Sequence, residues 1–294
     1  MKRHFFKRYQ GRGSYNLFSS YSHYLPGVKG MMGLLLLFFI GGLIGNLSTI
    51  GLTAAFGKNF TADYGTIISY PIMFIPVMLY ASMKSRLNEY RTPDIPLEKG
   101  GFSRKEWMTI GFAGVFSTIA LAYITEPVVT LLPEMPEKLE NTMKMVMEDM
   151  PLWATLLSVA VFAPLFEEWL CRGLVLRGLL HSMRPAPAII ISAIFFAILH
   201  MNPWQAIPAI SLGILFGYVY YRTGSLKLTM LMHCANNMFA VFFSKIPQFK
   251  DAKTMMDVLS PWAYWSIFAA CVVIVICSTM LFGKNPSQHQ KSNA

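Results

Sequence analysis

Three short stretches in the second half of the chain contain the residue types that peptide hydrolysis needs. A carboxylate can act as the base that activates water, and imidazole and amide N–H groups can hold the tetrahedral oxyanion. The candidates are a glutamate pair with an arginine, a single histidine, and a histidine with an asparagine: Glu167, Glu168, Arg172, His200, His233 and Asn237. Their types predict a hydrolytic site.

The spacing of the first stretch suggests a division of roles. Glu168 and Arg172 are four residues apart, so on a helix they share a face and can form an ion pair. Glu167 points about 100° away from Glu168 in α-helical geometry. One glutamate would then be neutralised and structural, and the other would be available for chemistry. The alternative is that both glutamates and the arginine form a single packing network.

The histidines and the asparagine carry weaker signals when each is taken alone. A lone histidine on an apolar helix, such as His200, is more often a satisfied core residue than a functional one. His233 and Asn237 are four residues apart and share a helix face, whereas Asn236 points elsewhere and is expected to pack. Their occurrence together favours function, because polar side chains inside a membrane need partners and a common cavity would supply them.

The rest of the chain has the composition of a membrane protein. Of its 294 residues 54% are hydrophobic and only 14% are charged, and the mean hydropathy is +0.44. The apolar residues form long runs, which predict about eight transmembrane helices in an all-α, polytopic bundle. The expected spans are 31–56, 64–83, 107–132, 151–172, 186–201, 203–221, 226–244 and 260–282.

Charge predicts the orientation of these spans. The net charge of +10 lies in segments beside the apolar runs, which indicates membrane topology and not a nucleic-acid partner. With both termini in the cytoplasm, the inner segments hold 19 of the 25 lysine and arginine residues. Glu126 is expected to be solvated near the outer end of its span. His200 reaches the depth of Glu167 only if the helix beginning at 185–187 starts below the membrane surface.

The chain divides into four expected regions. Residues 1–30 form a basic cytoplasmic segment, and residues 31–149 contain N-terminal transmembrane helices and loops. Residues 150–244 form the catalytic core, and residues 245–294 contain an outer loop, the last transmembrane helix and a short cytoplasmic tail. The four cysteines lie in apolar runs without paired spacing, which argues against a disulfide framework.

The three stretches resemble the signatures of the CPBP family, the CAAX proteases and bacteriocin-processing enzymes also called Abi. That family carries EExxxR, FxxxH and HxxxN on successive core helices. Here they are Glu167-Glu168…Arg172, Phe196…His200 and His233…Asn237, and the resemblance covers about residues 150–240. It implies endoproteolysis in a helical chamber, with water activation by Glu167 and His200 and oxyanion binding by His233 and Asn237. Glu168 and Arg172 would hold their helix in place, and Phe196 would pack behind the site.

The same resemblance leaves the cofactor open. Members are often described as metalloproteases, and Glu167, His200 and His233 could be zinc ligands. The sequence lacks HExxH, in which one helix supplies two zinc ligands and the base. A metal-free mechanism, similar to that of the Ras-converting CAAX endopeptidase, is favoured because it makes fewer conflicting demands on the glutamates.

Two alternatives to an enzyme are considered. One is a non-catalytic scaffold or bacteriocin self-immunity protein, which would be expected to lack a motif residue; none is missing. The other is a proton-coupled transporter, but no inverted repeat or pair of broken helices is visible. The expected partners are a peptide or membrane-protein substrate and the lipid bilayer of a cell membrane, with a bacterial cytoplasmic membrane favoured. The sequence leaves open the oligomeric state and whether the substrate is prenylated.

Overall fold

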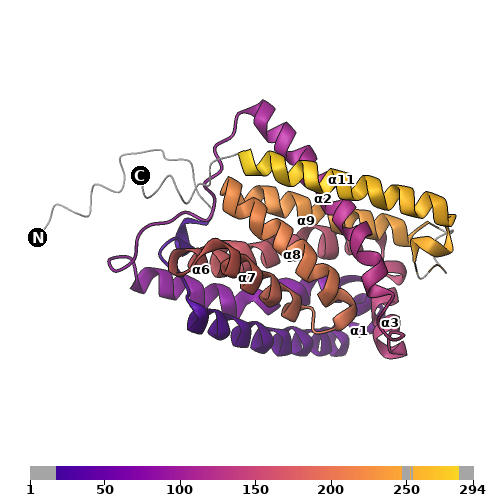
Figure 1. Ribbon diagram of the computed structural model, residues 1–294. Coiled ribbons are helices and arrows are strands. Elements are labelled where there is room, and N and C mark those ends of the chain that lie inside the picture. The colour runs from indigo at the N-terminus through magenta and orange to yellow at the C-terminus, as the bar shows by residue number, and fades with distance from the viewer. Residues whose placement is uncertain (1–17, 247–251, 253, 285–294) are drawn as a thin grey trace, which may run out of the picture.

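The computed structural model describes residues 18–246, 252 and 254–284, and this part of the chain is helical, with no strand (Figure 1). The longer elements are α1 (Val28–Leu87), α2 (Arg104–Val129), α3 (Glu137–Lys144), α7 (Pro185–Leu199), α8 (Pro203–Thr223), α9 (Leu226–Ser244) and α11 (Pro261–Lys284). A further helix extends over Leu152–Ser182 and contains α4 (Leu152–Thr155), α5 (Ala163–Glu168) and α6 (Arg177–Ser182). We call Leu152–Ser182 the glutamate helix. The predicted all-α fold is confirmed.

The glutamate helix is not uniformly α-helical. Leu156–Phe162 and Trp169–Leu176 are π-helical, and they flank the α-helical turn that carries Glu167 and Glu168. The wider π-turn is uncommon in proteins and occurs often at functional sites. These π-helical turns were not predicted from the sequence.

Within the described residues, four helices are long and apolar enough to cross a bilayer: α1, α2, the glutamate helix and α11. These helices make the chain a multi-pass membrane protein. The eight predicted spans all coincide with helices or helix arms, but α7 has only 15 residues, and α8 and α9 are not among the four. Helices α7 and α8 pack closely against each other, and α7 also has an apolar outer face, with Ile190, Ile194 and Ile198 50%, 45% and 43% exposed.

The first two predicted spans are the two arms of α1, which bends at Gly57. This residue has φ 85° and ψ 169°, a conformation that is essentially restricted to glycine. Close to the bend, the hydroxyl of Thr53 donates to the hydroxyl of Thr61 at 3.1 Å, so the two arms run back along each other. Helix α1 is therefore an antiparallel hairpin.

Small residues let the two arms approach each other closely. A Cβ atom placed on Gly41 would collide with the carbonyl oxygen of Met73, and one on Gly45 would lie 3.2 Å from the carbonyl oxygen of Ser69. Small residues spaced four apart are the usual way for membrane helices to bring their backbones together. We call this contact the hairpin seam.

Loops that were predicted to share a side of the membrane lie at the same end of the bundle. The backbone N–H of Lys99 donates to the carbonyl of Gly224 at 2.8 Å, which joins the α1–α2 loop to the α8–α9 turn. At the opposite end, the indole N–H of Trp204 donates to the carbonyl of Pro133 at 3.0 Å. For these two pairs, the predicted alternation of loops between the two ends of the bundle is confirmed. The cytoplasmic location of the first end stays a prediction from charge.

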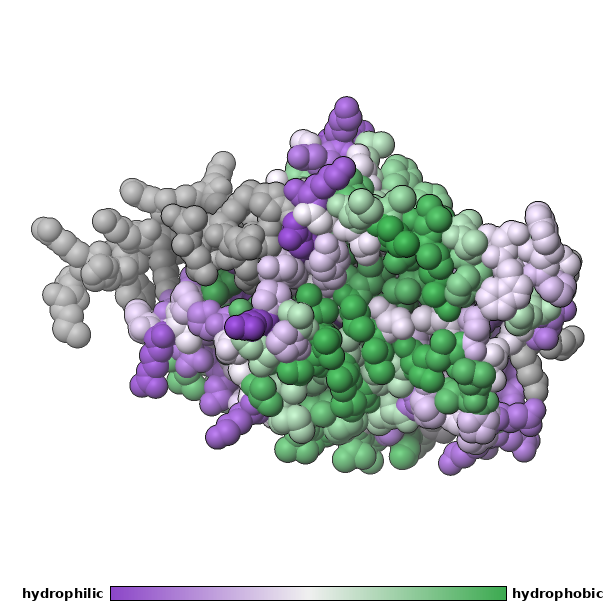
Figure 2. Space-filling model, in the orientation of Figure 1, coloured by the Kyte–Doolittle hydropathy of each residue, from purple (hydrophilic) through white to green (hydrophobic). Residues whose placement is uncertain are grey.

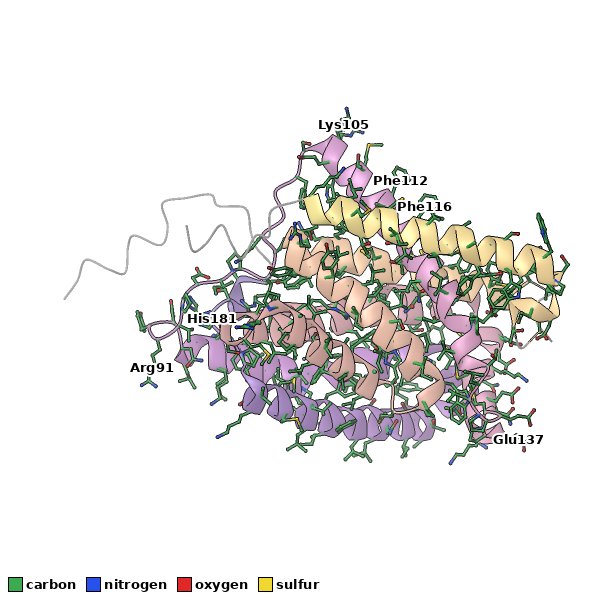
Figure 3. All side chains as sticks on the ribbon, viewed as in Figure 1. Arg91, Lys105, Phe112, Phe116, Glu137 and His181 are labelled. Atoms are coloured by element: carbon green, nitrogen blue, oxygen red, sulfur yellow. The ribbon has the colours of Figure 1, made fainter. Side chains whose placement is uncertain are left out.

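Hydrophobic residues form a band across the middle of the molecule, with hydrophilic residues toward the ends (Figure 2). Arg91 and His181 lie at one end and Glu137 at the other (Figure 3). Between these ends, Phe112 and Phe116 of α2 are 61% and 57% exposed. An apolar belt between polar ends is the surface that a bilayer requires.

Glu126 does not have the solvated environment that the sequence suggested. Its Oε1 accepts the backbone N–H of Met255, and its Oε2 is buried without a hydrogen-bond partner. The segment before α11 thus packs over this end of α2 and excludes water from the carboxylate. Much of the expected basic segment 1–30 and of the C-terminal tail lies outside the described residues, and the proposed four-region division stays a prediction.

Candidate active site

Glu168 is the most enclosed polar residue of the site. Its side chain is fully buried, and one oxygen, Oε1, accepts hydrogen bonds from Arg172 Nη1 at 2.7 Å and His233 Nδ1 at 3.1 Å. The other oxygen, Oε2, is buried without a partner. The predicted Glu168–Arg172 pair is confirmed, and the contact with His233 extends it to a second helix, α9.

Arg172 links the glutamate helix to the aromatic core. Its Nη2 donates to the carbonyl of Gly213 in α8 at 3.1 Å. The guanidinium carbon lies 4.7 Å from the ring centroid of Phe196 and 5.2 Å from that of Phe216. These contacts compensate in part for the cost of burying a guanidinium. Arg172 therefore fixes α7, α8 and the glutamate helix around one point.

His233 lies between the two glutamates. Its Nδ1 is 3.1 Å from Glu168 Oε1, and its Nε2 is 3.9 Å from Glu167 Oε2. Its ring packs edge-on against Phe196, at 5.5 Å between centroids, and lies tilted over Phe216 at 5.6 Å. An ionised carboxylate only accepts hydrogen bonds, so Nδ1 is the donor toward Glu168 and Nε2 is directed toward Glu167.

Glu167 is held at one oxygen and has its other oxygen without a partner. Its Oε1 accepts a hydrogen bond from the hydroxyl of Tyr70 at 2.5 Å, while Oε2 is buried and forms no hydrogen bond. Its side chain is 13% exposed, whereas that of Glu168 is not exposed. The two neighbouring glutamates thus occupy different environments, as their spacing predicted. The sequence did not indicate Tyr70, because nothing marks one tyrosine in an apolar run as the partner of a carboxylate 97 residues away.

His200 lies at the end of α7, beside the other site residues. Its Nδ1 is 3.0 Å from the carbonyl of Phe196, and its ring meets that of Phe196 edge-on at 5.0 Å between centroids. The rings of His200 and His233 thus both pack edge-on against Phe196, the residue expected to pack behind the site. Within the described part of the chain, His200 forms no hydrogen bond or ion pair with Glu167, and the joint role of these two in activating water stays a prediction.

Asn237 lies one turn beyond His233 on α9. Its amide nitrogen donates to the carbonyl of Val159 at 2.8 Å, and its amide oxygen accepts from Asn236 at 3.1 Å. Val159 belongs to the first π-helical stretch of the glutamate helix, so this bond joins α9 to the glutamate helix on the N-terminal side of the two glutamates. An amide nitrogen carries two protons, and one of them is used here.

The side chains do not fit a zinc centre in this arrangement. Among the described residues, no three His, Cys, Asp or Glu side chains are grouped so that they could hold a metal ion. Of the three ligands considered from the sequence, Glu167 and His233 approach each other, but Nδ1 of His233 is engaged by Glu168. Nδ1 of His200 lies 3.0 Å from the carbonyl of Phe196.

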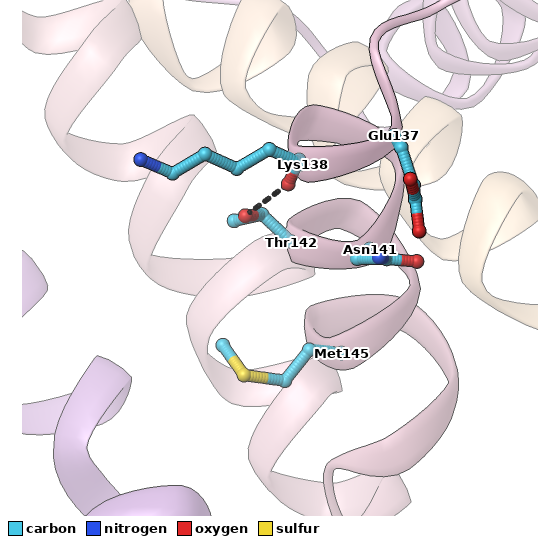
Figure 4. A pocket seen from close by; sticks show the side chains of 5 residues that line it. All are labelled: Glu137, Lys138, Asn141, Thr142 and Met145. Carbon is cyan, nitrogen blue, oxygen red and sulfur yellow. Dashed lines mark hydrogen bonds between the residues drawn. The ribbon is translucent and has the colours of Figure 1, made fainter.

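A separate hollow on the surface does not belong to this site. It is lined by residues of α3 and the residue after it, Glu137, Lys138, Asn141, Thr142 and Met145 (Figure 4). The hydroxyl of Thr142 donates to the carbonyl of Lys138 at 2.8 Å, as it does in many helices. The hollow shares no residue with the glutamate cluster and brings no second group of catalytic types together.

One comparison with known proteins agrees with this geometry. Residues 149–239 match the family described as type II CAAX prenyl endopeptidase Rce1-like. This segment begins just before the glutamate helix and ends two residues after Asn237, so it contains the three motifs. No curated protein and no solved structure matched the chain significantly.

Residues 149–239 are thus similar to a CAAX-type endopeptidase domain, and they lie within the helical bundle of a multi-pass membrane protein. The match supports the resemblance to CPBP endopeptidases that the three motifs indicated, and it supports an enzyme. Tyr70 and the hairpin of α1 lie outside the matched segment.

Proposed function

We propose that this chain is an intramembrane endopeptidase that uses Glu167 to activate water. The substrate class is a peptide segment of a membrane-associated protein, and the cellular location is the cytoplasmic membrane of a bacterium. The family description names a CAAX prenyl endopeptidase, so one candidate substrate is a protein anchored by a prenyl group. For a bacterial membrane, the substrate we favour is a leader peptide or a segment of a membrane protein.

One observation carries the proposal. Glu167 Oε2 is buried, has no hydrogen-bond partner and lies 3.9 Å from His233 Nε2. An unsatisfied carboxylate oxygen beside an imidazole is costly in a stable protein unless water or substrate occupies the space. The same arrangement is suited to a base and a donor that act on one peptide carbonyl.

The reaction follows from these positions. Glu167 takes a proton from water while the water oxygen attacks the carbonyl carbon of the scissile bond. The resulting oxyanion is held by N–H groups of His233 and Asn237, and Glu167 returns the proton to the leaving amine as the C–N bond breaks. Glu168 and Arg172 orient His233, and Phe196 keeps the back of the site dry.

The oxyanion role sets a condition on His233. Because Nδ1 donates to Glu168, the imidazole must carry a second proton on Nε2 to serve as a donor. With both protons on His233, the two glutamates, Arg172 and His233 form a cluster without net charge, which is the arrangement least costly to bury. His200 would join through a bridging water, since it does not contact Glu167 directly.

The test compares cells that produce the wild-type protein with cells that produce Glu167→Gln or His200→Ala. We expect a peptide product in the wild type, identified by labelling new N-termini, that is absent from both variants at equal protein level. Removing a general base typically costs about 10²- to 10⁴-fold in rate. If both variants generate the product as the wild type does, the chain is a scaffold or immunity protein and not a peptidase of this kind.

Metal dependence has its own measurement. We expect purified protein to cleave a peptide spanning the identified bond after thorough chelation and metal depletion. The metal content of the same active sample is measured at the same time. Loss of activity on depletion, with recovery on adding zinc, would contradict the metal-free mechanism.

A further inference from the structure

The hydroxyl of Tyr70 donates a hydrogen bond to Glu167, the proposed base, and Tyr70 belongs to the N-terminal hairpin. It donates to Glu167 Oε1 at 2.5 Å. Tyr70 lies on the second arm of α1, 97 positions before Glu167 in the sequence and outside the segment that matches the protease family. The contact therefore connects the catalytic core to a part of the chain to which no family role is assigned.

Aromatic packing fixes the position of this tyrosine. Its ring lies 5.6 Å from that of Phe74 on the same arm, and Phe74 stacks on Phe166 at 5.0 Å with an angle of 18° between the rings. Phe166 directly precedes Glu167, so the stack holds the hairpin against the turn that carries the base. Phe74 is fully buried, which leaves little room for the stack to shift.

The hairpin seam fixes the same tyrosine from the other side. Ser69, the residue before Tyr70, has its carbonyl oxygen against the backbone of Gly45 on the first arm. Since neighbouring residues of a helix point about 100° apart, the seam and the hydroxyl of Tyr70 occupy different faces of the same arm. The first arm thus supports the second arm while the second arm reaches the site.

We infer that Tyr70 is a positioning residue, which orients the Glu167 carboxylate so that Oε2 is the oxygen that receives the proton of water. The inference rests on the proposed function. With Oε1 occupied by the phenol, only Oε2 is free, and it is the oxygen directed toward His233. A carboxylate without this donor could rotate about its last bond and present either oxygen. Fixing one geometry is a recognised source of catalytic rate, because small misplacements of a reacting group are costly.

The experiment measures steady-state kinetics of purified full-length variants in detergent. The probe is an internally quenched peptide spanning the bond identified in the comparison of wild type with Glu167→Gln. We expect Tyr70→Phe to lower kcat by about tenfold, which corresponds to about 1.4 kcal/mol, and to leave KM nearly unchanged, since the phenol acts on the base and not on the substrate.

The matched control is Tyr80→Phe, which removes a hydroxyl from the same arm. The ring of Tyr80 packs edge-on against Tyr24 at 5.9 Å and lies 5.5 Å from Lys84 Nζ, and among the described residues no hydrogen bond joins it to Glu167. We expect its kcat to equal that of the wild type. Equal losses in Tyr70→Phe and Tyr80→Phe would mean that the hairpin matters only for general packing, and the inference would fail.

A double variant separates positioning from structural support. In the Glu167→Gln background, Tyr70→Phe should cause no further loss of residual activity, because the hydroxyl acts only through the carboxylate. A further loss would overturn the inference. If Glu167→Gln is fully active, the proposed function itself fails. If Glu167→Gln is inactive while Tyr70→Phe has the kcat of the wild type, only the role of Tyr70 fails.

Discussion

Two adjacent glutamates on one helix turn have different environments here. Glu168 is fully buried and its Oε1 accepts from Arg172 and His233, whereas Glu167 is partly exposed and its Oε1 accepts from Tyr70. In both residues Oε2 is buried without a hydrogen-bond partner among the described residues. An ion pair without solvent is stable only while both partners remain. This asymmetry supports the proposed roles, in which Glu168 is structural and Glu167 performs the chemistry.

The enclosed pair predicts a large effect on stability. We expect Glu168→Gln to lower the free energy of unfolding by about 3–5 kcal/mol, because it leaves the buried Arg172 charge without its partner. Thermal unfolding in detergent measures the change. The control is the double variant Glu168→Gln with Arg172→Met, which removes both charges and should recover part of the stability. Equal destabilisation of the single and double variants would show that the charge is not the cause.

At the scale of the helices, the hairpin seam makes another prediction. We expect Gly41→Ala to lower the free energy of unfolding by about 1–3 kcal/mol, because the new methyl group overlaps the Met73 carbonyl and forces the arms apart. Thermal unfolding in detergent is again the measurement. Gly51→Ala is the control, since a Cβ atom there meets nothing within 4 Å. A seam that tolerates alanine at position 41 as well as at position 51 would not be tightly packed.

The sequence predicted contacts within one helix better than contacts between helices. The Glu168–Arg172 pair follows from a spacing of four residues, and it is present. The contact of Glu168 with His233 depends on how α9 packs on the glutamate helix, and no local pattern encodes that. The expected cooperation of Glu167 and His200 in activating water likewise depends on how α7 packs on the glutamate helix, and it stays a prediction.

The span pattern was predicted from hydrophobicity alone, and it succeeded where helices face lipid. α11 is the clearest case, with only 11% of its most apolar window buried. The pattern was less informative for α7, whose 15 residues pack on α8 through Gly213. A Cβ on Gly213 would lie 2.9 Å from the backbone of Ala193, so the two helices are held by close contact and not by length. Hydropathy cannot distinguish a short interior helix from an incomplete span.

At the scale of the whole molecule, one buried arginine joins three segments at the predicted cytoplasmic end. Arg177 belongs to the glutamate helix and is 1% exposed. Its guanidinium donates to the carbonyls of Tyr21 and Tyr24, each at 2.8 Å, and to those of Ser22 and Ile95. The segment before α1 and the α1–α2 loop are thus tied to the helix that carries both glutamates.

The contacts of Arg177 predict which segments unfold first when these contacts are weakened. We expect Arg177→Met to remove one donor from each of these carbonyls and to speed cleavage by an added soluble protease in residues 18–26 and 88–97, by at least about tenfold. Limited proteolysis followed by mass spectrometry locates the cuts. Arg91→Met, at an exposed position on the same end, is the control and should be cut at the wild-type rate. Unchanged cutting in Arg177→Met would mean that other contacts hold these segments.

The hairpin of α1 also has a consequence for the order of assembly during synthesis. The contacts of its seam lie within residues 41–73, so they can form once that part of the chain has entered the membrane. Domains and hairpins made early in translation can fold before later segments exist. Tyr70 is then already in place on a formed hairpin when the ribosome reaches Glu167, and the later helix is docked against a finished surface. The N-terminal half would in this way act as a template for the half that carries the chemistry.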